Sequence, residues 1–130
     1  MKLGIAGGLI ILLSLTAFAP ASDASNPLNT TRWAEKGVNL GVRNELTRRL
    51  GKSTYLRMMR SDCRRTASAR FRCTFKAGVA DGYWIGAGTV RFLRGGIFPY
   101  SLRGRIEECG VYDCVKTGTF RWKGRAAPFG

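Results

Sequence analysis

Residues 70–77 alternate in polarity without interruption, and this stretch constrains the fold more than any other. One set of side chains is apolar or small, and the other is charged or polar. Successive side chains of a strand point to opposite faces, so this period indicates a half-buried antiparallel strand with one face in a core and one in water. The inward set is Phe71, Cys73, Phe75 and Ala77, and the outward set is Arg70, Arg72, Thr74 and Lys76.

The strand leads into Asp81-Gly82, a dipeptide that favours a two-residue type I′ hairpin turn. Such a turn would set Val79 opposite Trp84, Phe75 opposite Gly88, Cys73 opposite Val90 and Phe71 opposite Phe92. Every inward pair would then be apolar or small, which favours this register.

The next turn lies within residues 93–97 and has two possible lengths. A two-residue Gly95-Gly96 turn would drive Arg103 and Arg105 into the core, because a slip of one residue exchanges the two faces of a strand. A three-residue loop of Arg94 to Gly96 instead turns an apolar set inward. Burial therefore favours the longer loop, with Phe98, Tyr100, Leu102 and Ile106 inside.

The chain has four cysteines, Cys63, Cys73, Cys109 and Cys114. An even number in an exported chain favours disulfides over free thiols. Of the three possible pairings we favour Cys63–Cys73 and Cys109–Cys114. A zinc site is disfavoured, because the spacings lack two C-x2-C pairs and the chain contains no histidine.

The pairing of Cys109 with Cys114 also predicts the last strand, at about residues 115–122. Continued without irregularity, this register would set Glu107 opposite Lys116 and Arg105 opposite Gly118. It would also set Arg103 opposite Phe120. Phe120 and Trp122 would consequently point outward.

One helix is predicted before the strands, from about Arg32 to Leu50, with Thr30 or Thr31 as its cap and Gly51 as its stop. Its apolar stripe is Ala34, Val38, Val42, Leu46 and Leu50. Gly37 and Gly41 stand one turn apart, so we expect the helix backbone to approach a sheet closely there.

The first strand, about Tyr55 to Cys63, has the weakest pattern of the sheet. Pairing Cys63 with Cys73 would set Arg60 opposite Lys76, a like-charge contact that lowers stability. A bulge between these two pairs is the alternative.

These elements predict an α+β fold: one N-terminal helix packed on a four- to five-stranded antiparallel meander sheet, with two disulfides. The layout resembles the cystatin-like arrangement, in which a curled sheet surrounds a helix. The chain has no Gln-x-Val-x-Gly segment, so the resemblance implies a layout and not an inhibitory activity.

The first residues have the pattern of a secretory signal peptide: a short basic start, an apolar run and small residues. We expect a signal peptide over 1–21, cleaved after Ala21 or alternatively after Ala24, and a protein that is secreted or on the cell-envelope exterior. A flexible lead-in (22–30), one domain (31–123) and a loose basic tail (124–130) would follow. No second apolar run is long enough to span a bilayer.

The formal net charge is +14, from 22 basic and 8 acidic residues, and a charge of this size attracts polyanions. The predicted registers gather much of it on the sheet face that points away from the helix. The cations expected there are Arg70, Arg72, Lys76, Arg91, Arg103 and Arg105, interleaved with Tyr83, Ile85, Phe120 and Trp122.

Basic groups interleaved with aromatic rings suit a flexible anionic polymer, such as an envelope glycan, a nucleic acid or an acidic lipid surface. Three alternatives stay open. The face could be a solvated surface without a specific ligand. The protein could be an interaction or inhibitor domain that acts through the hairpin tips Asp81-Gly82 and Arg94-Gly95-Gly96. A membrane-active basic protein is the weakest alternative.

The sequence favours a binding protein over an enzyme. Without histidine, a Ser-His-Asp or Cys-His arrangement is impossible. Glu107, Glu108 and Asp113 cluster near one loop, but Glu107 has Lys116 as an expected partner. Residues 86–88 (Gly-Ala-Gly) lie in mid-strand and open no helix, so they predict no dinucleotide cofactor.

Overall fold

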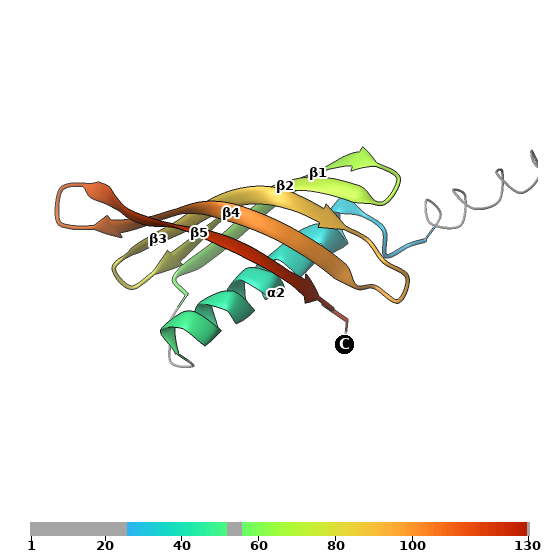
Figure 1. Cartoon of the computed structure of the whole chain (residues 1–130), viewed down its shortest axis with the longest axis horizontal. Helices are drawn as coiled ribbons and strands as arrows, with labels where there is room; N and C mark the ends of the chain where they lie inside the picture. The colour runs from blue at the N-terminus through green and yellow to red at the C-terminus, as the bar shows by residue number, and fades with distance from the viewer. Residues whose placement is uncertain (1–25, 52–55, 130) are drawn as a thin grey trace, which may run out of the picture.

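A computed structural model of the chain describes residues 26–51 and 56–129. The predicted signal peptide, residues 22–25 of the lead-in and the start of the first predicted strand at Tyr55 lie outside the described residues. The described part is one helix packed on an antiparallel sheet of five strands, in the order β1-β2-β3-β4-β5 (Figure 1). The predicted fold class is therefore confirmed.

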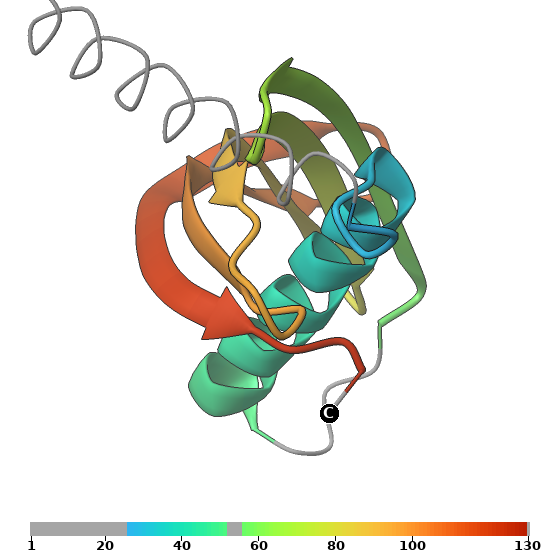
Figure 2. The ribbon, with the colours of Figure 1, turned by 90° about the vertical axis from the view of Figure 1, so that its right-hand side faces the viewer.

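The elements follow one another as a meander in which each strand pairs with the next. All five strands contact the helix, and the sheet curls around it, so that its outer face is convex (Figure 2). The helix and strands are α2 Thr31–Leu50, β1 Met58–Ala67, β2 Arg70–Val79, β3 Gly82–Arg91, β4 Phe98–Cys109 and β5 Cys114–Ala126.

The helix ends are determined locally, as expected. The Thr30 side chain accepts a hydrogen bond from the backbone N–H of Trp33 at 3.3 Å, which satisfies a helix N–H that has no intrahelical partner. Gly51 ends the helix with φ at 103°. The predicted stripe is buried except for Leu50, which is 48% exposed; its buried members are Ala34, Val38, Val42 and Leu46.

The two helix glycines allow the close approach that the sequence predicted. A Cβ at Gly37 would lie 3.1 Å from Cβ of Phe98, and one at Gly41 would lie 2.6 Å from the Tyr100 ring. Both distances are shorter than ordinary van der Waals contact. The helix backbone therefore packs directly against the β4 side chains.

Tyr100 also contacts Glu45, the one buried carboxylate in the described part of the chain. The Tyr100 hydroxyl donates a hydrogen bond to the Glu45 carboxylate at 3.4 Å. Glu45 is 4% exposed and forms ion pairs with Arg48 and Arg49. Glu45 lies off the predicted apolar stripe, so its burial was not predicted. Its two arginine partners stand at the end of the helix, where cations are also favoured by the helix dipole.

Burial, with the negative charge of Glu45 next to it, raises the pKa of Tyr100 to about 12, from 10.0. The folded protein therefore retains a proton that the unfolded chain releases, so stability present below pH 10 is lost as the pH rises towards 12. We expect Tyr100→Phe to flatten this alkaline decline. Denaturant unfolding of both proteins between pH 9 and about 12 measures the difference, and parallel pH profiles would contradict the expectation.

The β2–β3 hairpin differs from the prediction by two residues. Val79 pairs with Gly82, Phe75 with Gly86 and Cys73 with Gly88, so Ala80 and Asp81 form the turn. Neither Asp81 nor Gly82 has positive φ, which excludes the type I′ turn. A slip of two residues leaves each side chain on its predicted face, so the turn and the cross-strand partners were wrong and the faces were right.

The three-residue loop between β3 and β4 is confirmed. Leu93 pairs with Ile97 across it, and Gly95 and Gly96 adopt positive φ of 89° and 81°. Phe98, Tyr100 and Leu102 are buried and Ile106 packs against the core, as predicted from burial.

Both predicted disulfides are present. Cys63 pairs with Cys73 across β1 and β2, and Arg60 lies opposite Lys76 in the same register without a bulge between the two pairs. The irregularity of these strands lies instead between Arg65 and Ala67.

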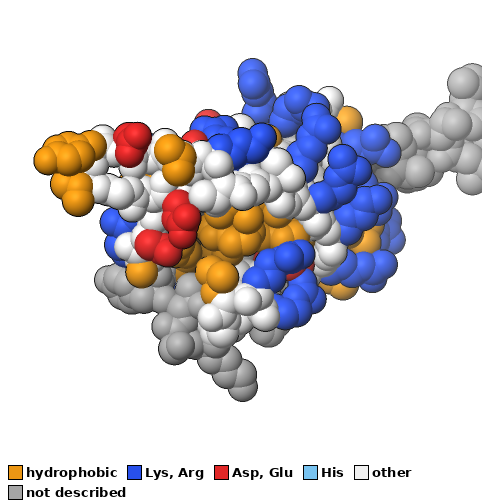
Figure 3. Space-filling view, turned by 60° about the vertical axis from the view of Figure 1, so that its left-hand side comes forward, with side chains coloured by type: hydrophobic (Ala, Val, Ile, Leu, Met, Phe, Trp, Pro, Cys, Tyr) orange, Lys and Arg blue, Asp and Glu red, His pale blue; other side chains and the backbone are white. Residues whose placement is uncertain are grey.

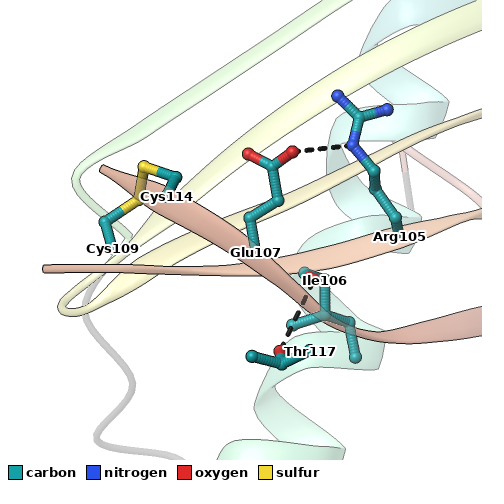
Figure 4. A network of polar contacts seen from close by, with 6 residues as sticks. All are labelled: Arg105, Ile106, Glu107, Cys109, Cys114 and Thr117. Atoms are coloured by element: carbon teal, nitrogen blue, oxygen red, sulfur yellow. Dashed lines mark hydrogen bonds and ion pairs between the residues drawn. A yellow bond between two sulfur atoms is a disulfide. The ribbon is translucent and has the colours of Figure 1, made fainter.

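The β4–β5 pair begins in the predicted register and then departs from it (Figure 4). Glu107 lies opposite Lys116, but Ile106 lies opposite Gly118, so Thr117 is an extra residue in β5. The Thr117 hydroxyl donates to the Ile106 carbonyl at 3.4 Å. Such a β-bulge puts two residues against one, and every side chain after it exchanges faces.

The C-terminal residues are more ordered than the predicted loose tail. β5 continues to Ala126, and the Phe129 ring lies 4.1 Å from the Trp33 ring, between centroids. The strand therefore extends beyond the predicted boundary at residue 123, and Phe129 contacts the helix through Trp33.

Candidate functional site

The face of the sheet that points away from α2 carries two neighbouring rows of residues, each aligned across β2, β3, β4 and β5. We call them the hydroxyl row and the guanidinium row. The hydroxyl row is Arg72, Thr89, Ser101 and Lys123. The guanidinium row is Thr74, Ala87, Arg103 and Arg121.

Both rows contribute residues to a shallow groove of about 370 Å³ on the outer face, and Thr74 lies outside its lining. Short side chains form its floor and long cationic ones form its walls. A second hollow of about 560 Å³ shares Ala87, Arg103 and Arg121 with it. The groove is lined by Arg72, Ala87, Gly88, Thr89, Ser101, Leu102, Arg103, Arg121 and Lys123.

The cations of the groove stand close together without compensating charge. Arg103 lies directly opposite Arg121 on the neighbouring strand, an arrangement that lowers stability for like charges. In the described part of the chain, no ion pair or side-chain hydrogen bond engages the side chains of Arg72, Arg103, Arg121 or Lys123. The carboxylate nearest in register is Asp62, opposite Thr74 on the edge strand β1.

The six predicted cations all lie on this outer face, but they do not form one cluster. Arg72 and Arg103 line the groove. Arg70 lies opposite Arg91 at one end of the sheet. Arg105 is engaged by Glu107, to which its Nε donates at 2.7 Å (Figure 4). Lys76 is half-buried, with Nζ 4.2 Å from the centre of the Tyr83 ring.

The predicted aromatic residues Phe120 and Trp122 are not on the outer face. The bulge at Thr117 turns both inward, where they are 8% and 2% exposed. They pack on one another, with ring centroids 4.3 Å apart, and on Trp84. Arg121 and Lys123 occupy the outer face in their place, although neither was predicted to lie there.

A signal for these two cations was present in the sequence. Residues 120–126 alternate between an apolar or small set and a basic set, as residues 70–77 do. This local alternation, used without the register across β4, would have placed the basic set in water.

Tyr83, the remaining predicted ring, is half-buried and has two cations against it. One is Lys76, and the other is Arg57, whose Cζ lies 5.5 Å from the centre of the ring.

Four acidic side chains lie towards the end of the sheet that carries the β4–β5 hairpin. Figure 3 shows most Lys and Arg side chains gathered away from the projecting end, towards which the Asp and Glu side chains lie. Val111 and Tyr112, at the tip of the β4–β5 hairpin, are 91% and 98% exposed. The acidic residues at this end are Asp81, Glu107, Glu108 and Asp113.

Comparison with known protein families, curated proteins and solved structures found no match to this chain. The cystatin-like comparison therefore gains no support. Among residues 26–51 and 56–129, no three His, Cys, Asp or Glu side chains gather as a metal site would require.

In the same ranges, no helix has both the length and the apolar character needed to cross a membrane.

Proposed function

We propose that this chain is a secreted binding module that holds an anionic polymer on the outer face of its sheet. The convergence of Arg72, Arg103, Arg121 and Lys123 around one groove without a carboxylate partner in the described part carries this proposal. An anion seated there would relieve the repulsion between Arg103 and Arg121. Two disulfides are compatible with an extracellular protein.

The shape and composition of the face favour an anionic glycan over nucleic acid. A convex surface meets a rigid duplex along a narrow strip only, whereas a flexible chain follows the curve. Proteins that bind single-stranded nucleic acids usually stack bases on exposed aromatic rings. Phe120 and Trp122 are buried, and two cations contact Tyr83, so no predicted ring offers an uncovered platform.

Removing two groove cations should weaken polymer binding far more than removing two cations elsewhere. We expect Arg103→Ser with Arg121→Ser to weaken heparin binding about a hundredfold, because hydrogen bonds to charged groups contribute about 1.5–3 kcal/mol each. The slope of log affinity against log salt should become shallower by about 1 to 2. Titration at several salt concentrations measures both quantities.

The matched control is Arg32→Ser with Arg43→Ser, since both of these residues are exposed on α2 and the net charge changes equally. The control should retain most of the affinity. Equal losses of affinity in the two double variants would mean that heparin binding depends only on the net charge of the protein. That result would contradict the proposal that the groove binds the polymer.

A second candidate function is a protein interaction through a hairpin tip. Of the tips predicted for this role, Gly82 is buried in β3 and Gly96 is covered by Phe129, whereas Asp81, Arg94 and Gly95 are exposed. The Cys109–Cys114 tip instead exposes Val111 and Tyr112 almost fully. Binding that resists salt and is lost when Tyr112 is replaced would identify this second function.

A further inference from the structure

The hydroxyl row has an order that general attraction to negative charge does not require. Across four strands it is cation, hydroxyl, hydroxyl, cation: Arg72, Thr89, Ser101 and Lys123. Thr89 and Ser101 are both exposed, and neither side chain makes a hydrogen bond in the described part of the chain. Two free hydroxyl groups therefore stand side by side between two positive charges.

The spacing of the row suits a compact anion with several oxygens. Neighbouring strands lie about 4.8 Å apart, so the two hydroxyls reach the same small group from adjacent strands. Arg103, in the adjoining row of the groove, approaches the same floor. Donors thus converge from both hydroxyls, from Arg72 and Lys123 at the ends of the row, and from Arg103.

A carboxylate uses such a site poorly. Its two oxygens lie in one plane, and a single guanidinium group binds both of them in a bidentate pair. Any arginine of the groove can form this pair without help from the hydroxyls of the floor. A sulfate or phosphate group presents oxygens in three dimensions and can accept from the hydroxyls and the cations together. The short floor residues also leave room for a group that projects from a polymer chain.

We propose that the groove is a subsite for a tetrahedral oxyanion, a sulfate ester or phosphate group carried by the polymer. The hydroxyls of Thr89 and Ser101 provide the selectivity, and Arg72, Arg103 and Lys123 provide the charge. This inference rests on the proposed function, since it names the chemistry of the anion bound by the same groove.

The test compares three polymers of matched length and charge density: dextran sulfate, polyphosphate and carboxymethyl dextran. The wild type should bind at least one tetrahedral oxyanion polymer about tenfold more tightly than the carboxylate polymer. A neutral hydrogen bond contributes about 0.5–1.5 kcal/mol, or roughly two- to tenfold. Thr89→Val with Ser101→Ala should therefore abolish the preference, because it removes both hydroxyl donors of the floor.

Two controls show that the hydroxyls themselves act. Thr74→Val removes a hydroxyl from the same face but outside the groove lining, and it should retain the preference. Thr89→Ser with Ser101→Thr keeps both hydroxyls and should retain it too. A stronger preference for dextran sulfate would indicate a sulfated glycan, and a stronger preference for polyphosphate a phosphate-bearing polymer.

The possible failures are distinguishable. Equal wild-type affinity for sulfate and carboxylate polymers would overturn the subsite and leave the proposed function standing. A preference that survives Thr89→Val with Ser101→Ala would do the same. Absence of salt-sensitive binding to all three polymers would overturn the proposed function itself.

Discussion

Replacing Trp122 with alanine should lower the free energy of unfolding by about 3–5 kcal/mol, the usual cost of truncating a buried aromatic residue. Trp122 is 2% exposed and packs against Phe75, Trp84 and Phe120. Its indole N–H donates no hydrogen bond in the described part. Trp122→Phe should therefore cost much less, because it keeps most of the packing and removes an unpaired donor.

The control is the neighbouring residue, Lys123, which is exposed. Lys123→Ala should change the free energy of unfolding by less than about 0.5 kcal/mol, as surface substitutions usually do. Urea denaturation of both variants gives the comparison. The opposite ranking would mean that β5 pairs with β4 without a bulge and that Trp122 lies on the outer face.

Replacing Gly88 with alanine should destabilise the protein by about 3 kcal/mol, at the upper end of the usual cost of overpacking. A Cβ at this position would collide with the backbone carbonyl oxygen of Ser101 and would lie 2.9 Å from Cα of Leu102. Backbone atoms paired in a sheet cannot move aside as a flexible side chain can. The strain would separate β3 from β4 under the floor of the groove.

The matched control is Ala87→Ser, one residue earlier in the same strand and exposed on the outer face. It should leave stability within about 0.5 kcal/mol of the wild type. Thermal and urea unfolding of the two variants measures the difference. If Gly88→Ala were as stable as Ala87→Ser, the close approach of β3 and β4 at this point would be wrong.

The features predicted correctly depend on contacts between residues near one another in the sequence. The helix bounds follow from Thr30 and Gly51. The three-residue loop follows from the need to keep Arg103 outside, and each disulfide joins strands that are adjacent along the chain. In these cases the local pattern and the tertiary contacts favour the same structure.

The β2–β3 turn could not be predicted in this way, because its position depends on a third strand. Backbone N–H of Cys109 donates to the Asp81 carbonyl at 2.8 Å. A Cβ at Gly82 would collide with the Glu107 carbonyl oxygen. The Asp81-Gly82 dipeptide suggested a type I′ turn. The structure instead requires glycine at residue 82 because the β4 backbone passes too close for a side chain.

Two of the four groove cations were predictable. Arg72 and Arg103 were expected on the outer face, and they line the groove. Arg121 and Lys123 were missed because the register was extended from Cys109–Cys114 without an irregularity. The floor formed by Thr89 and Ser101 was also missed, since neither residue type is distinctive until its neighbours on other strands are known.

By itself, the sequence determined the strand alternation, the helix with its caps, the cysteine pairing and the excess of positive charge. Only the tertiary structure decided which face Phe120 and Trp122 occupy, and hence which cations meet in the groove. The physical reason is the difference in size between two energies. Burying two large aromatic side chains contributes several kcal/mol, at about 1.5–3 kcal/mol or more each, and this outweighs one irregular pair at Thr117.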